Sequence, residues 1–157
     1  MKEYNKDAQR WFLQSEDDYR FVKYLKKEGD FFDKWCFMAQ QAGEKALKSC
    51  LYATGKRRVI GHSLYEMTGE LSKQDNRFRN IVSESKRLDR FYIPTRYPNG
   101  IPGGSPYQVY DIEDLKKAFE DLKMIVDICR HFLEDRGAIS SKDNSQKATN
   151  NKDLEQT

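Results

Sequence analysis

The 157-residue sequence lacks any apolar run that could cross a bilayer, which takes about 20 consecutive apolar residues. Its opening residues, 1–7, also lack the apolar core of a secretory signal. From these absences we expect a cytoplasmic protein with no membrane partner. The formal net charge of +3 is too small to indicate nucleic-acid binding by itself.

Cysteine and histidine are scarce, at three and two residues, and no CxxC pair occurs. Too few ligands remain for a structural zinc site, so we expect no bound metal. Cys36, Cys50 and Cys129 all fall inside helical patterns, and an odd count at such positions indicates reduced core thiols. A P-loop, a glycine-rich dinucleotide turn and a nucleophile–base signature are also missing. The sequence therefore indicates no cofactor and favours a protein without catalytic activity.

Strand patterns are absent as well, whereas apolar residues recur at helical spacing along most of the chain. We predict an all-α fold, an up-and-down bundle of four to five helices. Ser63 and Asp111 are candidate N-caps within it. The expected helices cover residues 4–27, 35–53, a short segment after Ser63, 75–91 and 111–136.

Proline is confined to the segment between the last two expected helices. Its four prolines, together with three glycines, predict a long Pro/Gly-rich loop without regular structure before the last helix. We expect residues 1–136 to form one helical domain. Residues 137–157 are polar and almost free of apolar side chains, which predicts a disordered tail.

The second expected helix carries apolar residues on two opposite faces. One stripe is rich in small side chains, and the other contains Phe37, Leu47 and Leu51, with Gln40 and Glu44 among them. Because a helix wetted on one side needs a single stripe, two stripes predict a central helix or one that also meets a second subunit. The small-residue stripe consists of Trp35, Met38, Ala39, Ala42, Ala46, Cys50 and Ala53.

Four short motifs follow one another along this helical frame. They are Trp11 with Asp17, Asp18 and Tyr19, the run CFMAQQAGEKALK at 36–48, GHSL at 61–64, and YIPTRYP at 92–98. Together they resemble the HEPN family (higher eukaryotes and prokaryotes nucleotide-binding domain) between residues 7 and 134. Gly43 departs from the family pattern, which more often has alanine there, and we expect the glycine to allow close approach of a neighbouring helix.

The resemblance implies a helical bundle that pairs as a symmetric homodimer. Members of the family are associated with nucleotide binding, with minimal nucleotidyltransferases as partners and, in some branches, with metal-independent RNA cleavage. A module of this kind also ends the co-chaperone sacsin. The resemblance therefore leaves a nucleotidyltransferase or a chaperone open as a partner.

Two positively charged features near the second and third helices are candidate phosphate contacts. Lys45 lies beside the small-residue stripe and could offer its ammonium group, whereas we interpret Glu44 and Lys48 as an exposed i,i+4 pair. Arg57 and Arg58 precede the start of the third helix, where free backbone N–H groups attract anions.

Arg96 and Tyr97 form a third candidate in the proline-rich loop. An arginine in a stiffened loop loses less entropy when it binds an anion. Tyr97 could stack on a nucleotide base or pin the loop to the bundle.

His62 follows Arg57 after four intervening residues, which fits the arginine–histidine spacing of the RNA-cleaving branch. Such a pair could supply an acid–base imidazole and a cation for the phosphate. In that branch a polar residue usually follows the arginine, where this chain has Arg58. A histidine in the glycine–histidine motif more often makes local hydrogen bonds or lines a pocket.

Three hypotheses result. The first is a non-catalytic, dimeric HEPN module that binds nucleotide or another phosphorylated ligand. The second is an HEPN-type metal-independent RNase or toxin that uses Arg57 and His62. The third is a dimerisation or scaffold domain that needs no ligand. For the first, the candidate ligand contacts are Lys45, His62, Arg96, Tyr97, Arg57 and Arg58.

Overall fold

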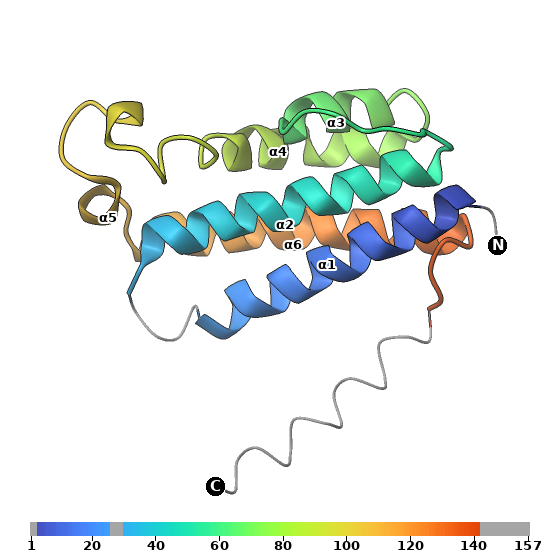
Figure 1. The fold of residues 1–157 in the computed structure, drawn as a ribbon, viewed down its shortest axis with the longest axis horizontal. Helices are drawn as coiled ribbons and strands as arrows, with labels where there is room; N and C mark the ends of the chain where they lie inside the picture. Colours follow the sequence, from blue (N-terminus) through green and yellow to red (C-terminus); the bar gives the residue numbers. More distant parts are fainter. Residues whose placement is uncertain (1–2, 26–29, 142–157) are drawn as a thin grey trace, which may run out of the picture.

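The computed structural model describes residues 3–25 and 30–141, and these residues form helices and loops with no strand, which confirms the predicted fold class. Three long helices run side by side, and two shorter ones pack against them (Figure 1). Among the helices described, none has the length and apolar content that a membrane crossing requires. The elements are α1 (Glu3–Leu25), α2 (Phe32–Ala53), α3 (Leu64–Leu71), η1 (Asn76–Ile81), α4 (Val82–Asp89), η2 (Pro98–Gly100), α5 (Pro106–Val109) and α6 (Ile112–Asp135).

Helix α2 is the central helix of the bundle, as its two apolar stripes indicated. It packs against α1, α3, α4 and α6, and fourteen of its 22 residues are buried. Leu47 and Leu51, from the second stripe, are almost inaccessible within this single chain. A second subunit is therefore not needed to explain their apolar character. Phe37, at the start of the same stripe, is only partly buried.

Gly43 lies where α3, α4 and α6 converge on α2. A Cβ atom at this position would stand 2.8 Å from Leu64 Cδ2 and 3.2 Å from Leu88 Cδ1. The first distance is shorter than real Cβ contacts, so the glycine allows α3 to approach α2 closely.

The helix predicted over 75–91 is divided in the structure into the 3-10 segment η1 and the α-helix α4. Asp75 caps η1 by accepting a hydrogen bond from the backbone N–H of Arg77. Phe78 and Ile81 are both fully buried. In a 3-10 helix, residues three apart lie on the same face, so this geometry places both side chains in the core.

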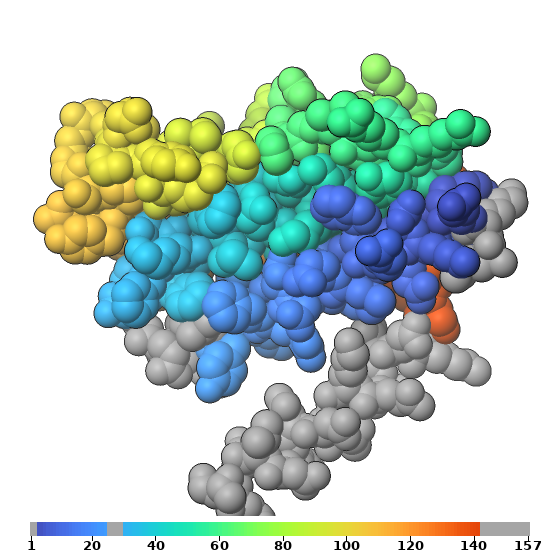
Figure 2. Space-filling model, viewed as in Figure 1, coloured from blue at the N-terminus to red at the C-terminus, as the bar shows by residue number. Residues whose placement is uncertain are grey.

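The prolyl segment contains two short helical turns, so the prediction that it has no regular structure was wrong. Pro98 and Pro106 each occupy the first turn of such a helix, η2 and α5 respectively. Proline is compatible with this position because the first N–H groups of a helix need no partner within it. Figure 2 shows the segment as a lobe at one end of the molecule, beside the start of α2.

The three cysteines are buried and form no disulfide. Burial raises the pKa of the Cys36 and Cys129 thiols well above the ordinary range, so both stay protonated and unreactive. No metal-binding cluster of acidic, histidine or cysteine side chains occurs within the described part of the chain. After α6, Ala138 is buried and Ile139 packs against the core. Most of the tail predicted at 137–157 lies outside the described residues.

Candidate functional site

His62 presents its ring at the surface beside a buried carboxylate. Its Nδ1 lies 3.1 Å from Oε1 of Glu44. The His62 side chain is 56% exposed, whereas that of Glu44 is 6% exposed. Since an ionised carboxylate only accepts hydrogen bonds, Nδ1 carries the proton in this pair. Nε2 is then the ring nitrogen left to meet a ligand.

Glu44 is also the centre of a buried polar network, so the interpretation of Glu44 and Lys48 as an exposed pair was wrong. Lys48 Nζ donates to Glu44 Oε1 over 2.8 Å, and both side chains are less than a tenth exposed. The Gln40 amide donates to Glu44 Oε2 at 3.3 Å and to the His62 carbonyl oxygen at 3.2 Å. These bonds hold the carbonyl group and the ring of His62 against α2.

The motifs at 36–48 and 61–64 therefore interlock through two adjacent residues of α2. Gly43 makes room for Leu64, and Glu44 binds the ring of His62. A change in the spacing between α2 and α3 would consequently move His62 relative to Glu44.

The ring of Tyr92 contacts both His62 and Arg96 and so brings these two residues close together. The His62 and Tyr92 rings stack, with centroids 4.9 Å apart and planes 18° apart. The Arg96 guanidinium lies 4.6 Å from the centroids of both Phe37 and Tyr92 and 5.2 Å from that of Tyr97. Its Nε donates to the Tyr92 carbonyl oxygen at 2.7 Å. We call Glu44, His62, Tyr92 and Arg96 together the His62–Arg96 site.

The N-terminus of α3 is already occupied by a carboxylate from the end of α4. Asp89 accepts hydrogen bonds from the Ser63 hydroxyl at 2.7 Å and from the N–H groups of Leu64 at 2.7 Å and Tyr65 at 3.1 Å. The predicted anion site at this helix start is thus filled from within the chain. Arg57 and Arg58 are exposed, and neither forms an ion pair with any residue in the described ranges.

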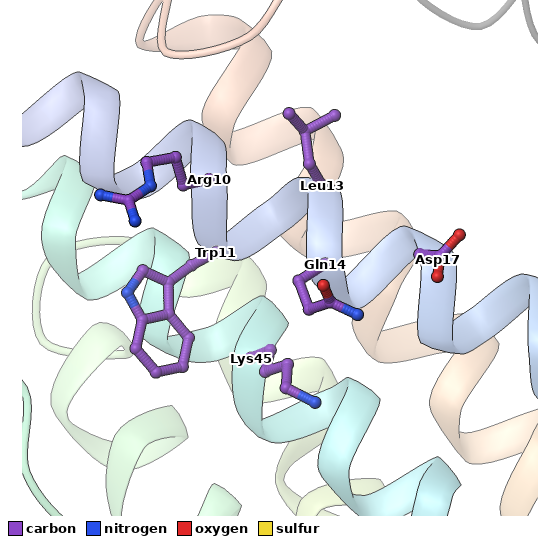
Figure 3. A pocket seen from close by; sticks show the side chains of 6 residues that line it. All are labelled: Arg10, Trp11, Leu13, Gln14, Asp17 and Lys45. Carbon is purple, nitrogen blue, oxygen red and sulfur yellow. The ribbon is translucent and has the colours of Figure 1, made fainter.

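Lys45 lies on the other flank of α2, facing α1. Its ammonium group forms an ion pair with Asp18, and the two side chains are 23% and 9% exposed. Beside it is an open hollow of about 690 Å³. Figure 3 shows the six residues that line the hollow, which are Arg10, Trp11, Leu13, Gln14, Asp17 and Lys45.

Of the predicted residues, His62, Arg96 and Tyr97 come together around Tyr92. Lys45 does not join them, because it pairs with Asp18 on the other flank of α2. Among the residues described, no hydrogen bond or ring contact links Arg57 to His62. The sequence reasoning missed the roles of Glu44 and Tyr92. For Glu44 the sequence did contain a signal, namely its position within an apolar stripe. If that stripe is buried, the carboxylate is buried with it and needs polar partners.

The fold and the site define an all-helical bundle whose central helix and following glycine–histidine motif are held together by a buried carboxylate. The family model for the HEPN domain matches residues 8–132. The chain therefore belongs to the HEPN domain family.

Three similar proteins match most of this chain, and one of them is itself described as an HEPN homologue. TT1696 from Thermus thermophilus is 31% identical, with a TM-score of 0.74 over 80% of this chain and 98% of that one. ST0689, described as an archaeal HEPN homologue, is 28% identical, with a TM-score of 0.65 over 83% of this chain and 98% of that one. A Methanocaldococcus jannaschii protein named "Putative toxin MJ1304" is 26% identical over 140 residues, which are 83% of this chain and 91% of that protein.

Proposed function

We propose that this HEPN protein is a non-catalytic, dimeric module that binds nucleotide or another phosphorylated ligand at the His62–Arg96 site. The observation that carries the proposal is the set of contacts that Arg96 makes. Its guanidinium group is held against three aromatic rings, yet it has no carboxylate partner among the described residues. A fixed, unneutralised guanidinium is well suited to bidentate phosphate binding, because little entropy is lost on binding.

The neighbouring groups complete a binding surface for a nucleotide. Tyr97 is half exposed beside Arg96 and offers a ring face to a base. The exposed His62 ring meets Glu44 through Nδ1, so its other nitrogen, Nε2, could donate a hydrogen bond to a phosphate oxygen when the ring is protonated. Lys45 is a weaker candidate contact, since Asp18 already neutralises its ammonium group. HEPN domains commonly dimerise, and this supports the dimeric part of the proposal.

Replacing Arg96 with alanine should weaken nucleotide binding by at least about tenfold, because a charge-assisted hydrogen-bond pair to phosphate is lost. Isothermal titration of the purified protein with ATP and GTP measures this change. Arg79→Ala removes an exposed arginine of η1 and is the matched control, for which we expect unchanged affinity. Lys45→Ala should have a smaller effect than Arg96→Ala.

Failure of millimolar ATP and GTP to bind or to shift the thermal midpoint of the wild-type protein would count against the proposal. Equal loss of affinity in Arg96→Ala and Arg79→Ala would contradict the placement of the ligand at the His62–Arg96 site.

A second candidate is metal-independent RNA cleavage, as in an HEPN-type toxin. Two observations favour it: His62 is oriented by a buried carboxylate, as an acid–base histidine must be, and one relative carries the name "Putative toxin MJ1304". This mechanism predicts RNA cleavage in the presence of EDTA that is lost in both His62→Ala and Arg57→Ala. Our main proposal predicts no cleavage by any of the three proteins. Cleavage that survives in His62→Ala would eliminate the His62 mechanism.

A further inference from the structure

The first of the four sequence motifs, which begins at Trp11, contributes no residue to the His62–Arg96 site. Trp11 and Asp17 instead line the hollow between α1 and α2, and Asp18 pairs with Lys45, which also lines it. The volume of the hollow, about 690 Å³, is within the range of about 300–1,000 Å³ that is typical of small-molecule pockets. These residues therefore gather at a second place that is suited to a ligand.

The indole ring of Trp11 offers a surface on which a flat ring can stack. Tyr52 and Lys48, both from α2, contact the indole, with the two ring centroids 5.9 Å apart and the Lys48 ammonium group 5.2 Å from the indole centroid. Figure 3 shows the ring lying over α2 with its broad face toward the viewer, beside the side chain of Lys45. Leu13, which is 45% exposed, adds an apolar group to the same hollow. A planar aromatic ligand would find both a stacking partner and apolar contact here.

Arg10 gives one end of the hollow a loosely held positive charge. Its side chain is 81% exposed, and the carboxylate oxygen with which it pairs, on Asp7, is 3.7 Å away and so beyond hydrogen-bonding range. The Lys45 ammonium group is already paired with Asp18, so it contributes a hydrogen-bond donor rather than a net charge. An anionic group beside the indole ring would therefore meet the Arg10 guanidinium, which can bind a carboxylate or a phosphate through two hydrogen bonds.

The opposite end of the hollow carries hydrogen-bond acceptors. Asp17 lies there, with one carboxylate oxygen paired with Arg20, and the Gln14 amide nitrogen donates to Asp18 at 2.9 Å, which leaves the Gln14 carbonyl oxygen to accept. Asp17 is seven residues from Arg10, or about 10 Å along the helix. This separation exceeds the Debye length of about 8 Å at physiological ionic strength, so Asp17 opposes an anion at Arg10 only weakly.

We propose that the hollow between α1 and α2 is a second binding site, which takes a planar aromatic anion. The ring of the ligand stacks on Trp11, and its anionic group binds Arg10. A nucleoside monophosphate and an aromatic carboxylate share this chemistry. The hollow contains no residue of the His62–Arg96 site, so the inference does not depend on the proposed function.

Tryptophan fluorescence tests the stacking on Trp11. The chain has two tryptophans, so Trp35→Phe leaves Trp11 as the only indole, and Trp11→Phe leaves Trp35. AMP and nicotinate are the two anionic probes, and adenosine and nicotinamide are their neutral counterparts. We expect saturable quenching of Trp35→Phe by at least one anion at millimolar concentration or below, and about tenfold weaker binding of its neutral counterpart. Trp11→Phe is the matched control and should show no saturable quenching. Quenching by AMP identifies a nucleotide as the ligand, and quenching by nicotinate identifies a carboxylate.

Arg10→Gln in the Trp35→Phe background should raise the dissociation constant of the anion by at least about fivefold, because the charged hydrogen-bond donor is lost. Arg79→Gln, at an exposed arginine of η1, should leave the constant unchanged. Arg96→Ala should also leave it unchanged. Isothermal titration of Arg96→Ala, which keeps both tryptophans, measures binding at the hollow even if Trp35→Phe fails to fold.

Three results would each overturn this second site: no saturable binding of either anion, equal affinity for an anion and its neutral counterpart, or an unchanged dissociation constant in Arg10→Gln. Loss of quenching in Arg96→Ala would overturn it as well, by placing the ligand at the His62–Arg96 site. Failure of ATP and GTP to bind in an Arg96-dependent manner bears on the proposed function alone.

Discussion

Replacing Glu44 with alanine is expected to lower the free energy of unfolding by about 3 kcal/mol or more, because it leaves a buried lysine without its counter-ion. Lys48 is 8% exposed at its side chain, and Glu44 Oε1 is the acceptor of its hydrogen bond. The Gln40 amide and His62 Nδ1 would lose the same carboxylate. Urea unfolding monitored by circular dichroism measures the change.

The double variant Glu44→Leu/Lys48→Met tests whether the stability lost in Glu44→Ala comes from an unpaired buried charge or from lost packing. Replacing both charges with apolar side chains of similar size removes the unpaired charge, so the double variant should be more stable than Glu44→Ala. Lys116→Ala breaks an exposed ion pair with Glu113 on α6 and should leave the urea midpoint unchanged. If Glu44→Ala behaved like Lys116→Ala, the buried network would have no energetic role.

Gly43→Val is expected to destabilise the protein by about 2 kcal/mol or more through overpacking. A Cβ atom at residue 43 already comes within 2.8 Å of Leu64 and 3.2 Å of Leu88, and valine adds two further methyl groups. The helical propensity of valine exceeds that of glycine by only a few tenths of a kcal/mol, so the cost of overpacking is larger and the variant should be less stable than wild type. Thermal and urea unfolding both measure this loss of stability.

Gly69→Ala is the matched control, since Gly69 lies inside α3 and nothing stands within 4 Å of a Cβ atom built there. With no contact to oppose the gain in helical propensity, this variant should be more stable than wild type by about 0.5–1 kcal/mol. Stabilisation by both variants would contradict the close approach of α3 to α2 at Gly43. Because Leu64 follows His62 by two residues, we also expect Gly43→Val to weaken ligand binding.

Residues of α2 contribute both to the stability of this bundle and to the geometry of the His62–Arg96 site. Gly43 and Glu44 are adjacent in the sequence. Gly43 leaves room for α3 to approach, and Glu44 binds the ring of His62, which precedes α3. The contact of Asp89 with the first N–H groups of α3 secures the same loop from the other side. The position of His62 therefore depends on three helices, although the residue itself belongs to a loop.

The sequence by itself determined the helices and the central place of α2. Apolar spacing, the caps at Ser63 and Asp111, and the two opposite stripes are local features, and each depends only on residues within a few turns. The division of the helix over 75–91 was missed because Phe78 and Ile81 are three residues apart, a spacing that puts two side chains on one face of an α-helix and of a 3-10 helix alike.

Only the tertiary structure decided which cations remain available to a ligand. Lys45 is paired with Asp18 and Lys48 with Glu44, and the anion site at α3 is filled by Asp89, which is 26 residues from Ser63. Arg96 instead meets aromatic rings from α2 and its own loop. Charge alone could not distinguish these cases, because the partner that neutralises a lysine or fills a helix end often comes from a distant part of the chain.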